Sequence, residues 1–281
     1  MPSGAGTPAR APLDGAARLG VEQAGEVAAG PPLSLSSVGP DPVPWDTALA
    51  AVLGYARGRR ALWFRSPGRP EGRWVRVPAF GYERFDCRPQ VAGPLGDDDV
   101  LVAEGLHGRL DPAGWAAVRS ALDEAGPMAD AVAARAGGRA FWELPPGELS
   151  VLEEPGTVGA GLRAVGRHGP GQHRDHLLAA LHHRRPGLVP LVGSTTRRQL
   201  LPHVEEGDSG PEAVVHRELR ANAEAFGALE TAASGLLTAT GGVPLTRLRL
   251  HDVLVWLSGS LRLAHAVALG RQTAEWTALR A

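Results

Sequence analysis

Apolar residues recur at helical spacing along most of the chain, and this pattern predicts a mainly α-helical protein. Helices are expected near residues 46–55, 112–126, 172–183, 212–230 and 246–257, and residues 97–99 are expected to form the first turn of another. Asp111 followed by Pro112 is typical of a helix start, and Gly126-Pro127 is expected to end that helix. The segment 246–257 is apolar on nearly every side, so we expect it to form a buried helix.

One short region has the pattern of strands instead. Residues 61–65 and 73–77 are rich in β-forming residues that nearly alternate with arginine, and a turn-rich segment, 66–72, separates them. We therefore expect a small β-hairpin near 61–77. Trp63 and Trp74 are expected to face each other across it as part of the core, with the arginines outward. The alternative is that these aromatic rings stack on nucleic-acid bases.

Composition divides the chain into three parts. Residues 1–40 are rich in Ala, Gly, Pro and Ser and lack a continuous apolar stretch, so they are expected to form a disordered leader. Residues 41–265 are expected to form a single mainly helical domain, and residues 266–281 a C-terminal tail or short helix. No run of eighteen apolar residues occurs. No membrane partner is expected, and a cytoplasmic location is the simplest interpretation.

Positive charge is gathered in two blocks, although the formal net charge of the chain is −1. Residues 57–76 contain seven arginines and one acidic residue, Glu71. Residues 163–198 contain seven arginines and one acidic residue, Asp175. Clustered positive charge attracts phosphates and carboxylates whatever the net charge of the protein. The second block also contains a glycine-rich turn at 169–171 before a helix, an arrangement that suits a phosphate. The residues predicted to bind nucleic acid are Arg163, Arg167, Arg174, Arg184, Arg185, Arg197 and Arg198.

The residue types that the chain lacks exclude several kinds of chemistry. Without lysine there is no P-loop, no protein-kinase site and no Schiff-base nucleophile. Cys87 is the only cysteine, which excludes an internal disulfide and a multi-cysteine metal site. His173, His176 and His183 have a spacing that metal ligands can use, but a basic surface is the favoured interpretation. No cofactor or metal is expected.

Two further positions are candidates for chemistry. Asp252 lies inside the apolar helix, where an unpaired carboxylate would be costly. We expect it to pair with an arginine or to cap a neighbouring helix, and an active-site carboxylate is the alternative. The run 207–211, with Ser209 at its centre, is similar to the surroundings of a serine-protease nucleophile, but a polar loop is the favoured interpretation.

Two stretches, HHRRPGLVPLVGSTTRR and VPLTRLRLHDVLVWL, resemble the signature blocks of a bacterial family of unknown function, domain-of-unknown-function family 6308. The similarity covers roughly residues 45–258, and only these two blocks are specific. That family is in turn distantly similar to helix-hairpin-helix DNA glycosylases. The resemblance implies a degenerate helix-hairpin-helix-like element around Gly169-Pro170-Gly171. The matching positions are Arg185-Pro186, Leu188-Val189-Pro190-Leu191, Leu248, Leu250, Asp252, Val253, Leu254, Val255 and Trp256, with Tyr82-Glu83-Arg84-Phe85 similar to an earlier segment.

The same resemblance bears on catalysis. Gly193 stands near the place where a glycosylase has its catalytic aspartate, so the usual base-excision chemistry lacks its carboxylate. The sequence therefore predicts a protein that binds nucleic acid through the phosphate backbone, possessing at most a catalytically inactive glycosylase-like fold. The alternatives are an enzyme acting on a small anionic or phosphorylated substrate, with Asp252 or His176 as acid–base groups, and a protein-interaction module.

Overall fold

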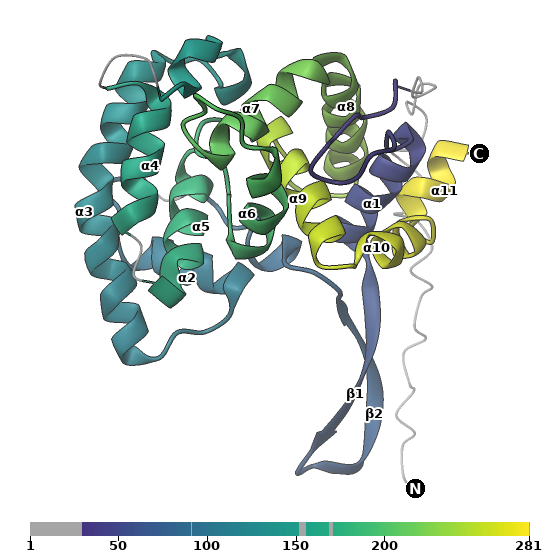
Figure 1. Ribbon diagram of the computed structural model, residues 1–281. Helices are drawn as coiled ribbons and strands as arrows, with labels where there is room; N and C mark the ends of the chain where they lie inside the picture. Colours follow the sequence, from purple (N-terminus) through teal and green to yellow (C-terminus); the bar gives the residue numbers. More distant parts are fainter. Residues whose placement is uncertain (1–29, 91, 152–155, 169–170, 281) are drawn as a thin grey trace, which may run out of the picture.

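The computed structural model describes residues 30–90, 92–151, 156–168 and 171–280. Over these residues the protein is mainly α-helical, with one two-stranded antiparallel sheet (Figure 1). The predicted fold class is confirmed.

The helices follow one another along almost the whole described chain. The α-helices are α1 (Trp45–Arg57), α2 (Asp97–His107), α3 (Pro112–Ala136), α4 (Val158–His168), α5 (Arg174–Arg184), α6 (Ser194–Leu200), α7 (Pro211–Ala221), α8 (Ala223–Ala239), α9 (Arg247–Gly259), α10 (Leu263–Gly270) and α11 (Ala274–Arg280). The strands are β1 (Arg59–Ser66) and β2 (Arg69–Pro78). Short 3-10 helices are η1 (Tyr82–Arg84), η2 (Phe141–Glu143), η3 (Pro146–Leu149), η4 (Gly171–His173) and η5 (Leu201–His203).

The helices gather in two groups that share one hydrophobic core. Helices α2 to α5 lie on one side of Figure 1, and α1, α8, α10 and α11 lie on the other, with α9 and α6 between them. Helices α1 and α10 approach so closely that glycine is required on both. A Cβ at Gly54 would lie 1.8 Å from the Ala266 carbonyl oxygen, and one at Gly270 would lie 1.7 Å from that of Ala50.

The first described residues differ from the expectation. Residues 1–29 lie outside the described residues, but the described end of the expected leader packs on the helical body. Leu33 pairs with Val43 through two backbone hydrogen bonds of 2.9 and 2.8 Å, and Leu33 and Leu35 are fully buried. Residues 33–43 are therefore part of the folded body, contrary to the expected bound of the leader at residue 40. Composition missed this segment because its two buried leucines stand among turn-forming residues.

Two predicted helix boundaries are also wrong. Helix α3 continues through Pro127 to Ala136, because Ala129, Val132 and Ala136 bury their side chains in the core and this packing outweighs the proline. The expected helix over 212–230 is broken at Asn222 into α7 and α8. The Asn222 amide is used there for tertiary bonds, exchanging two hydrogen bonds with the backbone of Ser34 at 2.7 and 2.9 Å.

The other expected helices are present. Asp111 caps α3 by accepting a 2.6 Å hydrogen bond from Gly114 N, and α9 is buried as its composition predicts. The region 266–281 continues as the helices α10 and α11. No single helix in the described part of the chain is long and apolar enough to cross a membrane. Only α9 and α10 taken together, bent by 119°, reach the necessary length and composition.

The hairpin is present, but it does not contribute to the core. Strands β1 and β2 pair as predicted, with Trp63 directly opposite Trp74, and they extend away from the helices into solvent (Figure 1). The Trp63 and Trp74 side chains are 43% and 68% exposed, so the expectation that they belong to the core is wrong. Alternation predicts which side chains pair across two strands, but it does not show whether another element covers them.

Candidate nucleic-acid interface and its pocket

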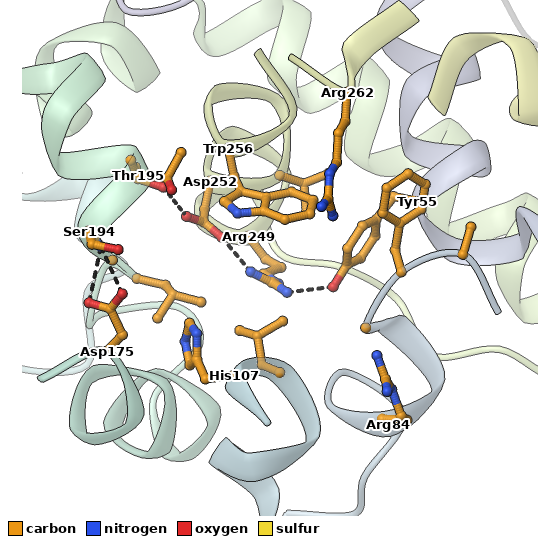
Figure 2. Close-up of a pocket in the computed structure, with 18 of the residues that line it drawn as sticks. Tyr55, Arg84, His107, Asp175, Ser194, Thr195, Arg249, Asp252, Trp256 and Arg262 are labelled. Atoms are coloured by element: carbon orange, nitrogen blue, oxygen red, sulfur yellow. Dashed lines mark hydrogen bonds and ion pairs between the residues drawn. The ribbon is translucent and has the colours of Figure 1, made fainter. Parts of the chain in front are cut away.

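A pocket of about 330 Å³ lies where α1, η1, α2, α6 and α9 meet (Figure 2). Aromatic side chains form part of its wall: Tyr55 from α1, Phe80 after the hairpin, and Trp256 from α9. Polar groups of α6, including Thr195, complete the opposite side. The pocket therefore combines apolar and hydrogen-bonding surfaces, as small-ligand sites usually do.

The floor of this pocket is a buried ion cluster around Arg249, which is 3% exposed. Its Nε donates to Asp86 at 2.7 Å. One terminal nitrogen donates to the Tyr55 hydroxyl at 2.5 Å, and the other pairs with Asp252 (Figure 2). Asp252 also accepts a 3.0 Å hydrogen bond from Thr196. Burial raises the pKa of the Asp252 carboxyl against the opposing effects of Arg249 and Thr196. The prediction that Asp252 pairs with an arginine is confirmed.

A second carboxylate, Asp175, lies at the side of the pocket. It projects from α5 and accepts hydrogen bonds from Ser194 N at 3.0 Å on both oxygens, at the first residue of α6 (Figure 2). A Cβ built at Gly193 would lie 3.6 Å from the Asp175 carboxylate. Position 193 has no side chain of its own, but a carboxylate from another helix occupies the space beside it.

Three arginines from different elements surround the pocket: Arg60 from β1, Arg84 from η1, and Arg262 just before α10. All three are exposed, and none forms an ion pair with an acid in the described ranges. The Arg262 guanidinium lies 5.5 Å from the centre of the Trp256 ring, a cation–π contact that leaves its donors available. The edge of the pocket is thus cationic, whereas the charges of its floor are compensated.

A groove of about 480 Å³ adjoins the pocket and shares Asp175 and Ser194 with it. Four arginines of the second block line this groove: Arg163 and Arg167 from α4, Arg174 from α5, and Arg197 from α6. Glu212 is buried at the same place, and burial raises its pKa against the opposing charges of the surrounding arginines. The structure therefore brings together four of the seven arginines that the sequence predicted to bind nucleic acid.

The four groove arginines are not equivalent. Arg174 joins two backbone segments, because its Nε donates to Gly166 O at 3.0 Å and a terminal nitrogen donates to Val192 O at 3.1 Å. Burial and the nearby charge of Arg197 lower the pKa of Arg174. Arg167 is exposed and Arg197 half-exposed, so these two have the freedom to meet a ligand.

The other three predicted arginines lie elsewhere. Arg184 is tied to the buried Asp99 and to the carbonyl oxygens of Gly93 and Pro94 at 3.1 and 2.9 Å. Arg185 pairs with Asp130 on α3. Arg198 is exposed on α6, outside the residues that line the groove. Arg184 and Arg185 have structural partners that the sequence did not reveal, because Asp99 and Asp130 are distant along the chain.

The histidines of α5 are used in packing. His176 and His183 are buried, and each contacts a backbone carbonyl oxygen, that of Gly108 at 3.0 Å and that of Arg88 at 3.1 Å. Within the described ranges, no three or more His, Cys, Asp or Glu side chains gather as ligands for a metal ion. The basic-surface interpretation of these histidines is wrong for both, since neither lies at the surface.

The other two candidate motifs are the run 207–211 and the expected helix-hairpin-helix-like element. Ser209 is buried, its N–H donates to Leu149 O at 2.8 Å, and its hydroxyl meets no hydrogen-bond partner within the described residues. The run 207–211 is therefore a loop without an activated nucleophile. Gly169 and Pro170, the expected centre of the helix-hairpin-helix-like element, lie outside the described residues.

Several residues around the pocket were missed from the sequence. Arg249 stands three positions before Asp252 on one helix, a spacing that places the two side chains side by side and could have identified the pair. Arg84, Arg262 and Trp256 come from separate segments, and nothing in their local sequence indicates that they meet. No family model, curated protein or solved structure matches this chain.

Proposed function

We propose that this protein binds nucleic acid through the phosphate backbone, along the path formed by the cationic edge of the pocket and the adjoining arginine groove. The observation that supports the proposal is that arginines from separate parts of the chain lie close together. Arginines from six separate segments line two adjoining hollows, and the acids near them are the half-buried Asp175, the buried Glu212 and the compensated Asp252. Clustered, accessible guanidinium groups bind phosphate oxygens through charge-assisted and often bidentate hydrogen bonds.

The net charge of the chain is consistent with local rather than general binding. At −1 overall, the protein does not attract polyanions over its whole surface, so affinity for them has to come from local cationic surfaces such as this path. The resemblance of two sequence blocks to family 6308, and through it to helix-hairpin-helix glycosylases, supports nucleic acid as the partner. The proposal concerns binding in the cytoplasm and includes no base excision.

The test is binding of a fluorescently labelled duplex at several salt concentrations. The variant Arg167→Glu/Arg197→Glu changes two accessible groove residues, and Arg139→Glu/Arg280→Glu is a matched control at exposed positions elsewhere. Two lost phosphate contacts should reduce the slope of log K against log salt by about 1.8. We expect the control to bind like the wild type. Absence of wild-type binding at low salt would refute the proposal.

A second candidate function is an enzyme or receptor for a small anionic ligand, because the pocket joins Asp252 to Asp175 on the histidine-rich α5. Such a ligand would place its acidic group at the three arginines and its apolar part against Trp256. Thermal-shift titration with small phosphorylated and carboxylated compounds tests it. A stabilising compound whose effect disappears in Trp256→Ala, while duplex binding is absent, would favour this function over the first.

A further inference from the structure

The projecting hairpin is the least expected feature of the molecule. Strands β1 and β2 form a two-stranded arm, residues 59–78, that extends from the helical body without a second layer on either face (Figure 1). An isolated two-stranded hairpin is marginally stable in water, since it has no core of its own. An arm of this kind normally has a partner that covers it.

The arm exposes large apolar side chains at neighbouring positions. Leu62, Trp63, Phe64 and Trp74 are 46%, 43%, 52% and 68% exposed. The Trp63 and Trp74 rings contact each other edge to face, with centroids 5.3 Å apart, and not the helices. Scattered exposed apolar residues need no explanation, but a contiguous group on a projecting element marks an interaction surface.

The same arm is strongly cationic. Beyond Arg59 it contains five exposed arginines and a single acid, Glu71. None of these five forms an ion pair with an acid in the parts of the chain that the structure describes. By contrast, Arg59 at the base of the arm pairs with Glu83, which attaches the arm to the body. The five are Arg60, Arg65, Arg69, Arg73 and Arg76.

The strand register places arginine on both faces of the arm. Trp63 pairs with Trp74 and Phe64 with Arg73, so the tryptophans and Arg73 lie on opposite faces. Arg76, opposite Ala61, shares the face of the tryptophans, and Arg60, opposite Val77, shares that of Arg73. Cations and apolar groups are therefore available on both sides of the same ribbon.

We propose that this arm enters the major groove of double-stranded DNA, as a second contact beside the path on the helical body. The proposal rests on the proposed function and names its substrate as a duplex. The groove of a double helix is walled by two phosphate chains, which matches a ribbon that carries arginine on both faces. A single strand could meet only one face of the arm at a time.

The dimensions of the arm support this choice of groove. A strand of eight residues is about 26 Å long at about 3.3 Å per residue. The major groove of B-DNA, about 12 Å wide, admits a two-stranded ribbon, whereas the minor groove, about 6 Å wide, does not without deformation. Arg60 belongs both to the arm and to the pocket edge, so one bound duplex can run from the arm onto the body.

Other partners fit the arm less well. A second copy of this arm would bring like charges together, which opposes self-association. An anionic membrane surface or an acidic protein would satisfy the charge, but neither presents two anionic walls to the two faces. The uncompensated arginines on both faces are the observation that favours DNA over these partners.

The experiment compares three labelled probes of equal length: a DNA duplex, an RNA duplex and a DNA single strand. The major groove of A-form RNA is deep and narrow, so the arm should not enter it. We expect the wild type to prefer duplex DNA and, on binding it, to show less acrylamide quenching of tryptophan fluorescence. The variant Arg65→Gln/Arg73→Gln/Arg76→Gln should lose about 2.7 units of salt slope on duplex DNA. Trp74→Ala should retain most of that slope but weaken the preference for duplex DNA.

The outcomes distinguish the proposal for the arm from the proposed function of the helical body. If the groove variant Arg167→Glu/Arg197→Glu weakens binding while both arm variants bind like the wild type, the arm proposal is overturned and the proposed function stands. Equal binding of all three probes by the wild type also overturns it. Protection of the arm tryptophans by phosphatidylserine-containing vesicles, without protection by duplex DNA, would assign the arm to a membrane surface instead.

Discussion

Replacement of Arg249 by methionine tests whether the pocket floor is held together by charge. Arg249 is the only cation in direct contact with Asp86 and Asp252 among the described residues, and the side chains of all three are less than 10% exposed. Arg249→Met nearly preserves the volume of the side chain but leaves two largely buried carboxylates without their cationic partner. Removing one member of a buried ion cluster costs about 3–5 kcal/mol, because the remaining charge is uncompensated.

The assay is urea unfolding followed by far-ultraviolet circular dichroism, with the midpoint and slope fitted for each variant. We expect Arg249→Met to be destabilised by about 3–5 kcal/mol at pH 7, and by less at pH 5. The pH effect follows because burial already raises the pKa of Asp252, and protonation relieves the uncompensated charge.

A variant with the whole cluster neutralised, Arg249→Met/Asp86→Asn/Asp252→Asn, is the matched control. It should regain more than half of the lost stability, since no unpaired charge remains. A single variant that loses less than about 1 kcal/mol, or a triple variant no more stable than the single one, would show that this reasoning about the floor is wrong.

Three other substitutions have definite expected outcomes. Burial opposes ionisation of Glu218, but hydrogen bonds from His251, Ser37 and Ser36 outweigh it and lower its pKa to about 2. Because this is below the ordinary value of 4.5, ionised Glu218 should contribute about 3 kcal/mol to the free energy of unfolding above pH 4.5. This contribution should be lost as the pH falls towards 2, and the loss should be absent from the pH profile of Glu218→Gln. Gly54→Ala should lower the melting temperature markedly, since its Cβ would lie 1.8 Å from the Ala266 oxygen, whereas Ala at Gly235, which meets nothing within 4 Å, should not. Trp74→Ala should change the unfolding free energy by less than about 0.5 kcal/mol, a result that a core position could not give.

The sequence predicted local structure well where the signal was itself local. The Asp111 cap, the hairpin register and the buried α9 depend on residues within a few positions of one another, and each is present. Expectations failed where a distant contact decides the outcome. Pro127 is tolerated because α3 is buried on the core, and the helix over 212–230 is broken at Asn222, whose amide exchanges hydrogen bonds with Ser34.

The candidate site shows the same limit more clearly. Arginine clustering in sequence did identify a cationic region, but it could not separate the arginines with structural partners from those that are accessible. Arg184 and Arg185 lie within one of the two specific sequence blocks, yet their acids come from α2 and α3. Nothing in the sequence identified Arg84 or Arg262 as site residues, yet they complete the edge of the pocket. Which charges remain uncompensated is decided by the tertiary fold.

The hairpin arm is the clearest case in which the local pattern does not show what covers a surface. Alternating apolar and charged residues normally indicate one face in the core and one in water, and for β1 and β2 that inference gives a core position to Trp63 and Trp74. The structure leaves both faces in water, so the alternation here does not mark a core face, and we propose that it serves a partner. Natural proteins protect exposed strand edges with charge, and the arginines here serve that purpose without explaining the aromatic rings between them. A partner that is anionic on two sides and offers apolar groups between its charges would account for both, and the major groove of a DNA duplex, with its thymine methyl groups, has that construction.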